Sequence, residues 1–197
     1  MTRIGITGGI GSGKSYLCHQ IEAQGDPVFY CDDEAKRIIR SHAAVKADLQ
    51  ALVGQGVYDD SGALRKQVLA RYLCQGKAAA ARVDAIVHPR VAEAWRAYCQ
   101  AHATHQYIYM ECALLFESGF DRWTDYTVLV TAPEPVRVQR IMARDGVTRE
   151  AAEAWIALQM PEQAKAERAD ACLINDGRQD LAAEWASLMA SLRQQHP

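Results

Sequence analysis

Residues 8–15 read Gly8-Gly9-Ile10-Gly11-Ser12-Gly13-Lys14-Ser15, a complete G-x-x-x-x-G-K-[ST] phosphate-binding loop (P-loop). A short apolar stretch (Ile4, Ile6) precedes it, and a run with helical spacing starts at Leu17. In this context of strand, glycine turn and helix, successive backbone N–H groups and the helix N-terminus point at the same anion. The pattern predicts a site for a nucleoside triphosphate, with Lys14 on the outer phosphates and the Ser15 hydroxyl on Mg²⁺.

Composition narrows the class of protein. The chain has 197 residues and a formal net charge of −2, which suits one α/β domain with insertions and gives no basic field for nucleic acid. Its six cysteines include no C-x-x-C pair, so small buried thiols in a reducing compartment are favoured over metal or disulfide use. We find no signal peptide and no long apolar run. We therefore expect a soluble, cytoplasmic protein with no nucleic-acid or membrane partner.

Alternating apolar runs predict an α/β fold, a P-loop NTPase-type doubly wound sheet of five mainly parallel strands. The expected strands are a short one around Ile4, then residues 28–31, 107–110, 126–130 and 171–174. The segment of about sixty residues between the second and third strands has helical spacing and exceeds what a crossover needs, so we expect it to bind substrate. The expected organisation is a nucleotide-binding core (1–43, 105–147, 169–197), a helical substrate subdomain (44–104) and a helical lid (148–168).

Acidic residues follow two of the expected strands. Asp32 comes at the end of the second strand and Glu111 after the third. Open parallel sheets bind ligands at the carboxyl ends of their strands, so Asp32 can face a bound γ-phosphate and Glu111 can hold Mg²⁺ through water. Each acid also has a structural alternative, Asp32 as a helix cap and Glu111 as a hydrogen-bond acceptor.

Three arginines, Arg137, Arg140 and Arg144, lie on one expected helix at spacing i, i+3 and i+7. A guanidinium at the entrance of a lid can neutralise charge as a phosphoryl group moves. Arg140 and Arg144 are the candidates for that role. Arg137 is expected to be a solvated surface residue without a part in the site.

Taken together, these motifs resemble the dephospho-CoA kinase family over nearly the whole chain. The similar segments are residues 6–15, His88-Pro89, residues 114–119 (Leu-Leu-Phe-Glu-Ser-Gly), Arg140, residues 144–150, Gln159, residues 169–170 and residues 175–177. The chain departs from the family pattern at Tyr30, where the first acid of a D-x-D often stands, at Ala113 in place of Pro, and at Tyr16 in place of Thr.

The resemblance implies that ATP phosphorylates the ribose 3′-hydroxyl of dephospho-CoA, giving CoA and ADP, with Mg²⁺ as cofactor and no obligatory protein partner. It implies catalytic roles for Lys14, Asp32 and Arg140. The implied nucleotide contacts are Gly9, Ile10, Gly11, Ser12, Gly13, Lys14, Ser15, Tyr16, Arg144 and Asn175, with Ser15 also on the metal. The implied substrate contacts are Thr7, Asp32, His88 and Leu115.

Two alternatives concern single residues. A free aspartate has a pKa of about 3.9, which makes it a poor base for an alcohol, and the loose transition state of phosphoryl transfer needs little activation of the nucleophile. Asp32 is therefore expected to orient the hydroxyl and take its proton late. His88 is either part of the substrate wall or an ordinary histidine before a proline that stops the helix.

Two other functions stay open at this stage. Another nucleoside monophosphate or small-molecule kinase would use the same loop but does not account for the later motifs. A regulatory GTPase or ATP-dependent switch is disfavoured, because Thr131-Ala132-Pro133-Glu134 stands where an N-K-x-D base-reading motif would follow a strand. Turnover that depends on an acceptor substrate separates a kinase from a switch.

Overall fold

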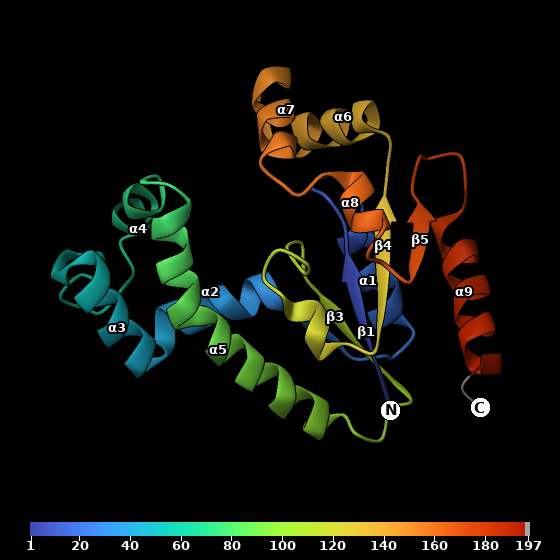
Figure 1. Cartoon of the computed structure of the whole chain (residues 1–197), viewed down its shortest axis with the longest axis horizontal. Coiled ribbons are helices and arrows are strands. Elements are labelled where there is room, and N and C mark those ends of the chain that lie inside the picture. The colour runs from blue at the N-terminus through green and yellow to red at the C-terminus, as the bar shows by residue number, and fades with distance from the viewer. Residues whose placement is uncertain (196–197) are drawn as a thin grey trace. The chain divides into compact units, whose positions relative to one another are not determined.

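The apolar runs of the sequence form the strands of one sheet in a computed structural model that describes residues 1–195 (Figure 1). The strands are β1 (Thr2–Thr7), β2 (Val28–Tyr30), β3 (Tyr107–Glu111), β4 (Tyr126–Thr131) and β5 (Ala171–Ile174), and in the described part of the chain the sheet has the order β2-β3-β1-β4-β5. The central strand β1 is parallel to β3 and β4, and β4 is parallel to β5. All of β3 is buried, as expected for a strand covered on both faces. The predicted α/β fold is confirmed.

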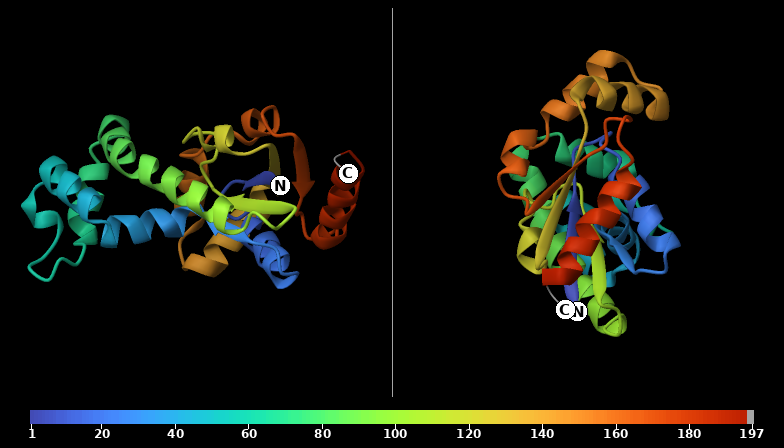
Figure 2. Two further views of the ribbon diagram at one scale, coloured as in Figure 1. Left: turned by 90° about the horizontal axis from the view of Figure 1, so that it is seen from below. Right: turned by 90° about the vertical axis from the view of Figure 1, so that its right-hand side faces the viewer.

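Most of the chain belongs to a unit made of Met1–Phe29 and the segment from His102 onward. Its helices are α1 (Lys14–Ala23), the 3₁₀ helix η2 (Phe120–Trp123), α6 (Glu134–Asp145), α7 (Arg149–Ala157), α8 (Glu162–Ala166) and α9 (Leu181–Gln195). Helices α1 and α8 lie on opposite faces of the sheet (Figure 2). Helices α6 and α7 lie beyond the carboxyl ends of the strands, while the N-terminus lies at the opposite edge (Figure 1). The carboxyl edge therefore carries the loop, α6 and α7.

A second compact unit consists of Tyr30–Ala101. Its helices are α2 (Cys31–Ser41), α3 (Ala43–Val53), the 3₁₀ helix η1 (Gln55–Val57), α4 (Lys66–Leu73) and α5 (Lys77–Ala101). The unit begins earlier than residue 44, where we expected the substrate subdomain to start, so α2 and Asp32 belong to it. The functional assignment of residues 44–104 to substrate binding and of 148–168 to a lid stays a prediction.

Helix α5 continues through Pro89, so the alternative in which this proline stops a helix is wrong. A proline inside a helix removes one backbone hydrogen bond and costs about 3 kcal/mol. Val87, Val91 and Trp95 are buried on both sides of it, and burial of each such side chain contributes about 1.5–3 kcal/mol. Packing of one continuous helix face therefore offsets the local cost.

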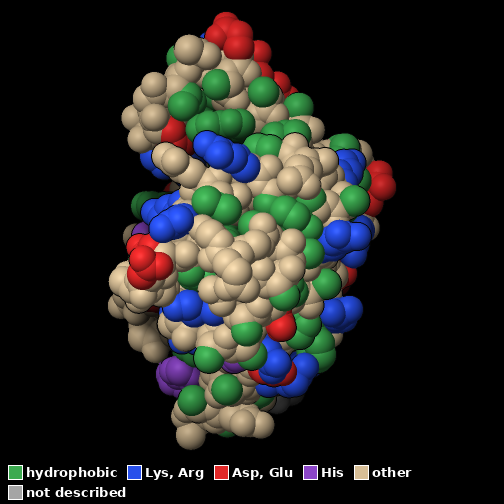
Figure 3. Space-filling view, turned by 90° about the vertical axis from the view of Figure 1, so that its left-hand side faces the viewer, with side chains coloured by type: hydrophobic (Ala, Val, Ile, Leu, Met, Phe, Trp, Pro, Cys, Tyr) green, Lys and Arg blue, Asp and Glu red, His purple; other side chains and the backbone are tan. Residues whose placement is uncertain are grey.

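The surface bears on the kinds of partner. Within residues 1–195, no helix combines the length and apolar character that a membrane span needs. On the face drawn in Figure 3, Lys and Arg side chains are interspersed with acidic and apolar ones. The expectation that the chain binds no nucleic acid stays a prediction.

Candidate active site

The phosphate-binding loop connects β1 to α1, as the sequence predicts. Helix α1 begins at Lys14 with Gly13 as its N-cap, and the Ser12 amide donates to the Gly9 carbonyl oxygen at 3.1 Å. The free amides of the first helical turn and the positive end of the helix dipole lie at the loop. Within the described residues the buried Ser12 hydroxyl has no hydrogen-bond partner. The loop thus presents backbone amides and the Ser12 hydroxyl to an anion.

The loop lysine is paired with the acid that ends β3. Lys14 Nζ lies 3.3 Å from Glu111 Oε1, and the two side chains are only 12% and 7% exposed. Glu111 stands opposite Ile6 in the register of β3 and β1, which brings its carboxylate to the residue pair just before the loop. We predicted a role for Glu111 at this edge, but its pairing with Lys14 was not foreseen.

Cys18, one turn along α1, shares this environment. Burial is the main cause that raises the pKa of the Cys18 thiol well above its usual value, and the Glu111 carboxylate adds to it. Because the thiolate is the reactive form of cysteine, Cys18 is inert at neutral pH. All six cysteines are free, and four of them are buried as expected; Cys74 and Cys172 are exposed instead.

Arg140 and Asn175 hold the other side of the loop. Arg140 Nη1 lies 3.3 Å from the carbonyl oxygens of Gly11 and Ser12, and its Nη2 lies 3.3 Å from Asn175 Oδ1. Asn175, directly after β5, donates from Nδ2 to the Ser12 oxygen at 2.8 Å. The structure therefore brings two predicted site residues from distant parts of the chain to the loop.

A hollow of about 470 Å³ opens beside this cluster. Its lining residues are Gly13, Tyr16, Arg140, Asn175, Gln179, Asp180 and Leu181. Tyr16 is 57% exposed and offers an aromatic surface next to the loop. The volume is typical of small-molecule sites, and the mixture of an aromatic ring, a guanidinium and an amide suits a nucleoside.

The donors at the loop fit a Mg²⁺ ion that arrives with phosphates. The Ser15 hydroxyl is on an exposed residue of the first turn of α1, and Glu111 supplies a carboxylate. Residues 1–195 contain no group of three or more His, Cys, Asp or Glu suited to hold a metal. Mg²⁺ is usually held by substrate phosphates, water and one or two protein oxygens, and that is the donor set available here.

Two predicted substrate residues, Thr7 and Leu115, are completely buried. Thr7 Oγ1 donates to the Ala113 carbonyl oxygen at 3.4 Å, and Leu115 packs against Gly5 of β1. Their side chains hold the segment after β3 against β1 and present no exposed surface to a substrate.

Asp32 and His88 belong to the helical unit. Tyr30, not Asp32, is the N-cap of α2, and no side chain caps that helix. Asp33 and Glu34 each pair with a basic residue one turn along α2, whereas the exposed Asp32 makes no ion pair within residues 1–195. His88 Nε2 lies 3.4 Å from Asp84 Oδ1 on the same helix. Of the neighbouring acids, Asp32 is the one left available for chemistry.

Arg137 contradicts the expectation of a solvated residue. It is 5% exposed, and its Nη2 occupies the place where a side chain on Gly9 would begin, 2.2 Å from the ideal Cβ position. Since Gly9 has no side chain, the Arg137 face of α6 can pack against the loop. Arg144 instead pairs with Asp145 and is exposed, so the structure does not bring it to the loop.

Sequence reasoning also missed contacts of Gln159 and Glu162. Gln159 accepts a hydrogen bond from the Ile10 amide, and Glu162 pairs with Arg137. Both stand between α7 and the end of α8, far from the loop in sequence. Gln159 belonged to a family-like motif without a role, and nothing in a single sequence pointed to Glu162.

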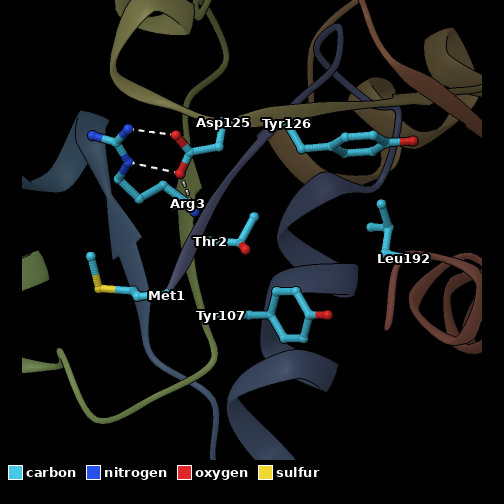
Figure 4. Close-up of a pocket in the computed structure, with 7 residues that line it drawn as sticks. All are labelled: Met1, Thr2, Arg3, Tyr107, Asp125, Tyr126 and Leu192. Atoms are coloured by element: carbon cyan, nitrogen blue, oxygen red, sulfur yellow. Dashed lines mark hydrogen bonds and ion pairs between the residues drawn. The ribbon is translucent and has the colours of Figure 1, made fainter. Parts of the chain in front are cut away.

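A further hollow, of about 390 Å³, lies at the opposite edge of the sheet, where the strands begin (Figure 4). Arg3 and Asp125 line it and are joined by two hydrogen bonds, from Nε at 2.9 Å and from Nη2 at 2.5 Å. Because the two charges satisfy each other and open sheets bind ligands at their carboxyl edge, this hollow is not the candidate active site.

Comparisons with known proteins agree with this geometry. Residues 2–180 match the model of a family described as dephospho-CoA kinase. A dephospho-CoA kinase of Bacteroides fragilis is 40% identical over 192 residues, which cover 98% of this chain and 93% of that protein. The crystal structure of TT1252 from Thermus thermophilus superposes with a TM-score of 0.80 at 34% identity, covering 97% of each chain. A dephospho-CoA kinase from Campylobacter jejuni has the same fold, with a TM-score of 0.72 at 20% identity over 99% of this chain and 98% of that one.

Proposed function

This chain belongs to the dephospho-CoA kinase family, and we propose that it transfers the γ-phosphoryl group of ATP to the ribose 3′-hydroxyl of dephospho-CoA. The products are CoA and ADP. The observation that carries the proposal is the phosphate-binding loop with Lys14 held beside Glu111 at 3.3 Å, in a chain that matches named dephospho-CoA kinases over nearly its full length. This reaction class gives each unused donor of the site a partner.

The triphosphate binds along the loop amides and the first turn of α1. Lys14 moves from Glu111 to the outer phosphate oxygens, a small displacement because the ammonium is already at the loop. Mg²⁺ would be held by Ser15 Oγ and phosphate oxygens, with Glu111 bonded to its water, and it would neutralise charge on the β- and γ-phosphates.

Arg140 adds a second positive charge from the side of α6. Its contacts to the Gly11 and Ser12 carbonyl oxygens and to Asn175 are long, at 3.3 Å each, so phosphate oxygens can replace them at little cost. The nucleoside of ATP takes the hollow lined by Tyr16 and Asn175. Arg144 reaches the nucleotide only if it leaves Asp145.

Asp32 orients the acceptor. Its carboxylate accepts a hydrogen bond from the ribose 3′-hydroxyl; the 3′-oxygen bonds to the γ-phosphorus as the bond from that phosphorus to the ADP oxygen breaks. The hydroxyl proton passes to Asp32 and then to water. The helical unit, with His88 on α5, receives the rest of dephospho-CoA. Both substrates are small soluble molecules, which supports a cytoplasmic protein without a nucleic-acid, membrane or obligatory protein partner.

The test is a coupled assay of ADP release with dephospho-CoA, AMP and adenosine as alternative acceptors. Binding of the long arm of dephospho-CoA helps fix the ribose for attack, so we expect a higher kcat and a lower KM for dephospho-CoA than for AMP or adenosine. A kcat/KM for AMP comparable to that for dephospho-CoA would overturn the proposal in favour of a nucleoside monophosphate kinase.

A further inference from the structure

Both backbone polar groups of Ile10, in the middle of the loop, are bonded by side chains from outside it. The Ile10 amide donates to Gln159 Oε1 at 2.8 Å, and Arg137 Nε donates to the Ile10 carbonyl oxygen at 2.9 Å. Arg137 Nη1 in turn pairs with Glu162 at 2.5 Å. The centre of the loop is therefore held by α6 and by the segment that runs from α7 into α8.

The held peptide is the central one of a tight turn. Ser12 bonds back to Gly9, and Gly11 has a φ of +79°, the value that a type II turn requires at its third residue. Rotation of the central peptide, between Ile10 and Gly11, converts a type II turn into a type I turn. Glycine tolerates both forms, so the local sequence does not choose between them.

The bond from Arg137 makes this choice. In a planar trans peptide the C=O and the next N–H point in opposite directions. By holding the Ile10 oxygen, Arg137 turns the Gly11 N–H away from α6. In the type I form the same N–H would face α6, away from any phosphate that the opposite side of the loop binds.

The segment that contains Gln159 and Glu162 is itself held by contacts with the residues after β3. The Met160 amide donates to Glu117 Oε1 at 3.1 Å, and the buried Lys165 Nζ lies 3.1 Å from the same oxygen. Lys165 also lies 3.3 Å from the Ala113 carbonyl oxygen. Residues 159–165 are thus fastened to the segment after β3.

We propose that Arg137 is a positioning residue for nucleotide binding, which keeps the Gly11 amide directed at the phosphates, with Gln159 and Glu162 as its supports. The inference rests on the proposed function, because it requires phosphates at this loop. Without the Arg137 bond the Ile10–Gly11 peptide samples both orientations, and the affinity for phosphate is multiplied by the fraction of molecules that stays competent to bind.

The experiment measures binding of ATP, inorganic tripolyphosphate and dephospho-CoA by calorimetry in wild type and variants. Arg137→Met should weaken ATP and tripolyphosphate by the same factor, about 10- to 100-fold, as expected for one hydrogen bond from a charged donor. Affinity for dephospho-CoA should not change, whereas a merely destabilised protein would lose all three ligands. If the Met variant does not fold, Arg137→Lys replaces it in the same experiment. The lysine ammonium lacks the planar group with which Arg137 bonds Glu162 and Ile10 together.

Two matched variants separate the bond to Ile10 from the ion pair. Glu162→Gln keeps the bond from Arg137 Nε to the Ile10 carbonyl oxygen. Its affinity for ATP and tripolyphosphate should fall by less than about threefold, a fraction of the energy of one hydrogen bond. Arg149→Met breaks another Arg–Glu pair, with Glu153 on α7, and should change nothing. Equal losses in Glu162→Gln and Arg137→Met, or unchanged tripolyphosphate affinity in a folded Arg137→Met, would overturn the inference. A wild type that binds neither ATP nor tripolyphosphate would overturn the proposed function instead.

Discussion

An ion pair lies at each end of the strands, one at their carboxyl ends and one at their amino ends. Both pairs join a basic side chain to a carboxylate, but they differ in exposure and in the number of contacts between the two groups. At the carboxyl edge, the side chains of Lys14 and Glu111 are only 12% and 7% exposed, and Lys14 Nζ lies 3.3 Å from Glu111 Oε1. At the amino edge, Arg3 and Asp125 are 36% and 38% exposed and share two side-chain hydrogen bonds, with a third from the Arg3 amide to the same carboxylate.

The difference bears on which edge of the sheet is suited to bind an anionic ligand. Burial of two charges is expensive unless their remaining hydrogen-bonding capacity is used, and a lysine with one partner keeps donors to spare. A phosphate can accept hydrogen bonds from those donors of Lys14. The exposed Arg3–Asp125 pair shares two side-chain hydrogen bonds and contributes about 0–1 kcal/mol to stability.

Lys14→Ala should abolish measurable phosphoryl transfer and leave the fold intact, because glycines permit the loop turn and Gln159 and Arg137 hold it, without help from this side chain. Steady-state kinetics and thermal unfolding check the two halves of the prediction. A variant that keeps more than about a tenth of the wild-type rate has lost less than about 1.4 kcal/mol of barrier lowering. That result would contradict a direct role of the buried cation.

Asp32→Asn extends the contrast to an acid that makes no ion pair within the described residues 1–195. It should lower kcat by roughly 10²–10⁴, the usual range for a positioned acid–base group, with little change in the KM for ATP. Asp33→Asn is the matched control, since Asp33 is already paired with Lys36 at 2.8 Å, and it should be mild. If Asp33→Asn were the damaging change, the catalytic carboxylate would be the neighbour and not Asp32.

How far the sequence predicts the site depends on the range of the interactions. The loop, the strands and the acid at the end of β3 are local patterns, and all were predicted within one or two residues. Asp32 and Glu111 stand out because strand ends locate them. These inferences need only the chain neighbours of each residue.

Arg137 shows where this reasoning fails. Helical spacing puts Arg137 and Arg140 near one face of α6. It does not reveal that Gly9 leaves room for the Arg137 guanidinium, or that Glu162 forms an ion pair with it. The prediction that Pro89 stops a helix fails for the same reason, because packing of the buried residues on both sides of it keeps α5 continuous. Contacts between distant segments override local preference in both cases.

Glu111→Gln removes one charge of the buried pair while keeping its shape. If the carboxylate bonds to the water of Mg²⁺, the Mg²⁺ concentration for half-maximal activity should rise about tenfold, the lower range for loss of an outer-shell partner. The free energy of unfolding should fall as well, because glutamine leaves the Lys14 ammonium, whose side chain is only 12% exposed, without its counter-charge. An unchanged Mg²⁺ dependence would leave Glu111 with the sole role of holding Lys14.

Arg3→Ala breaks the exposed pair and should have the smallest effect. We expect the free energy of unfolding to fall by at most about 1 kcal/mol, with kcat and both KM values unchanged.

Arg3 holds the pKa of Asp125 below its usual value of 3.8. Because the folded-state pKa is the lower one, the stabilisation is complete above the usual value and disappears as the pH falls through the depressed pKa. Urea unfolding should therefore show a constant difference between wild type and variant from about pH 7 to 5, closing below about pH 3. The backbone amide of residue 3 still donates to Asp125 in Arg3→Ala. Asp125→Asn should therefore lower the free energy of unfolding slightly more than Arg3→Ala does. A gap that widens in acid, or any loss of activity, would mean that the amino edge does more than support the sheet.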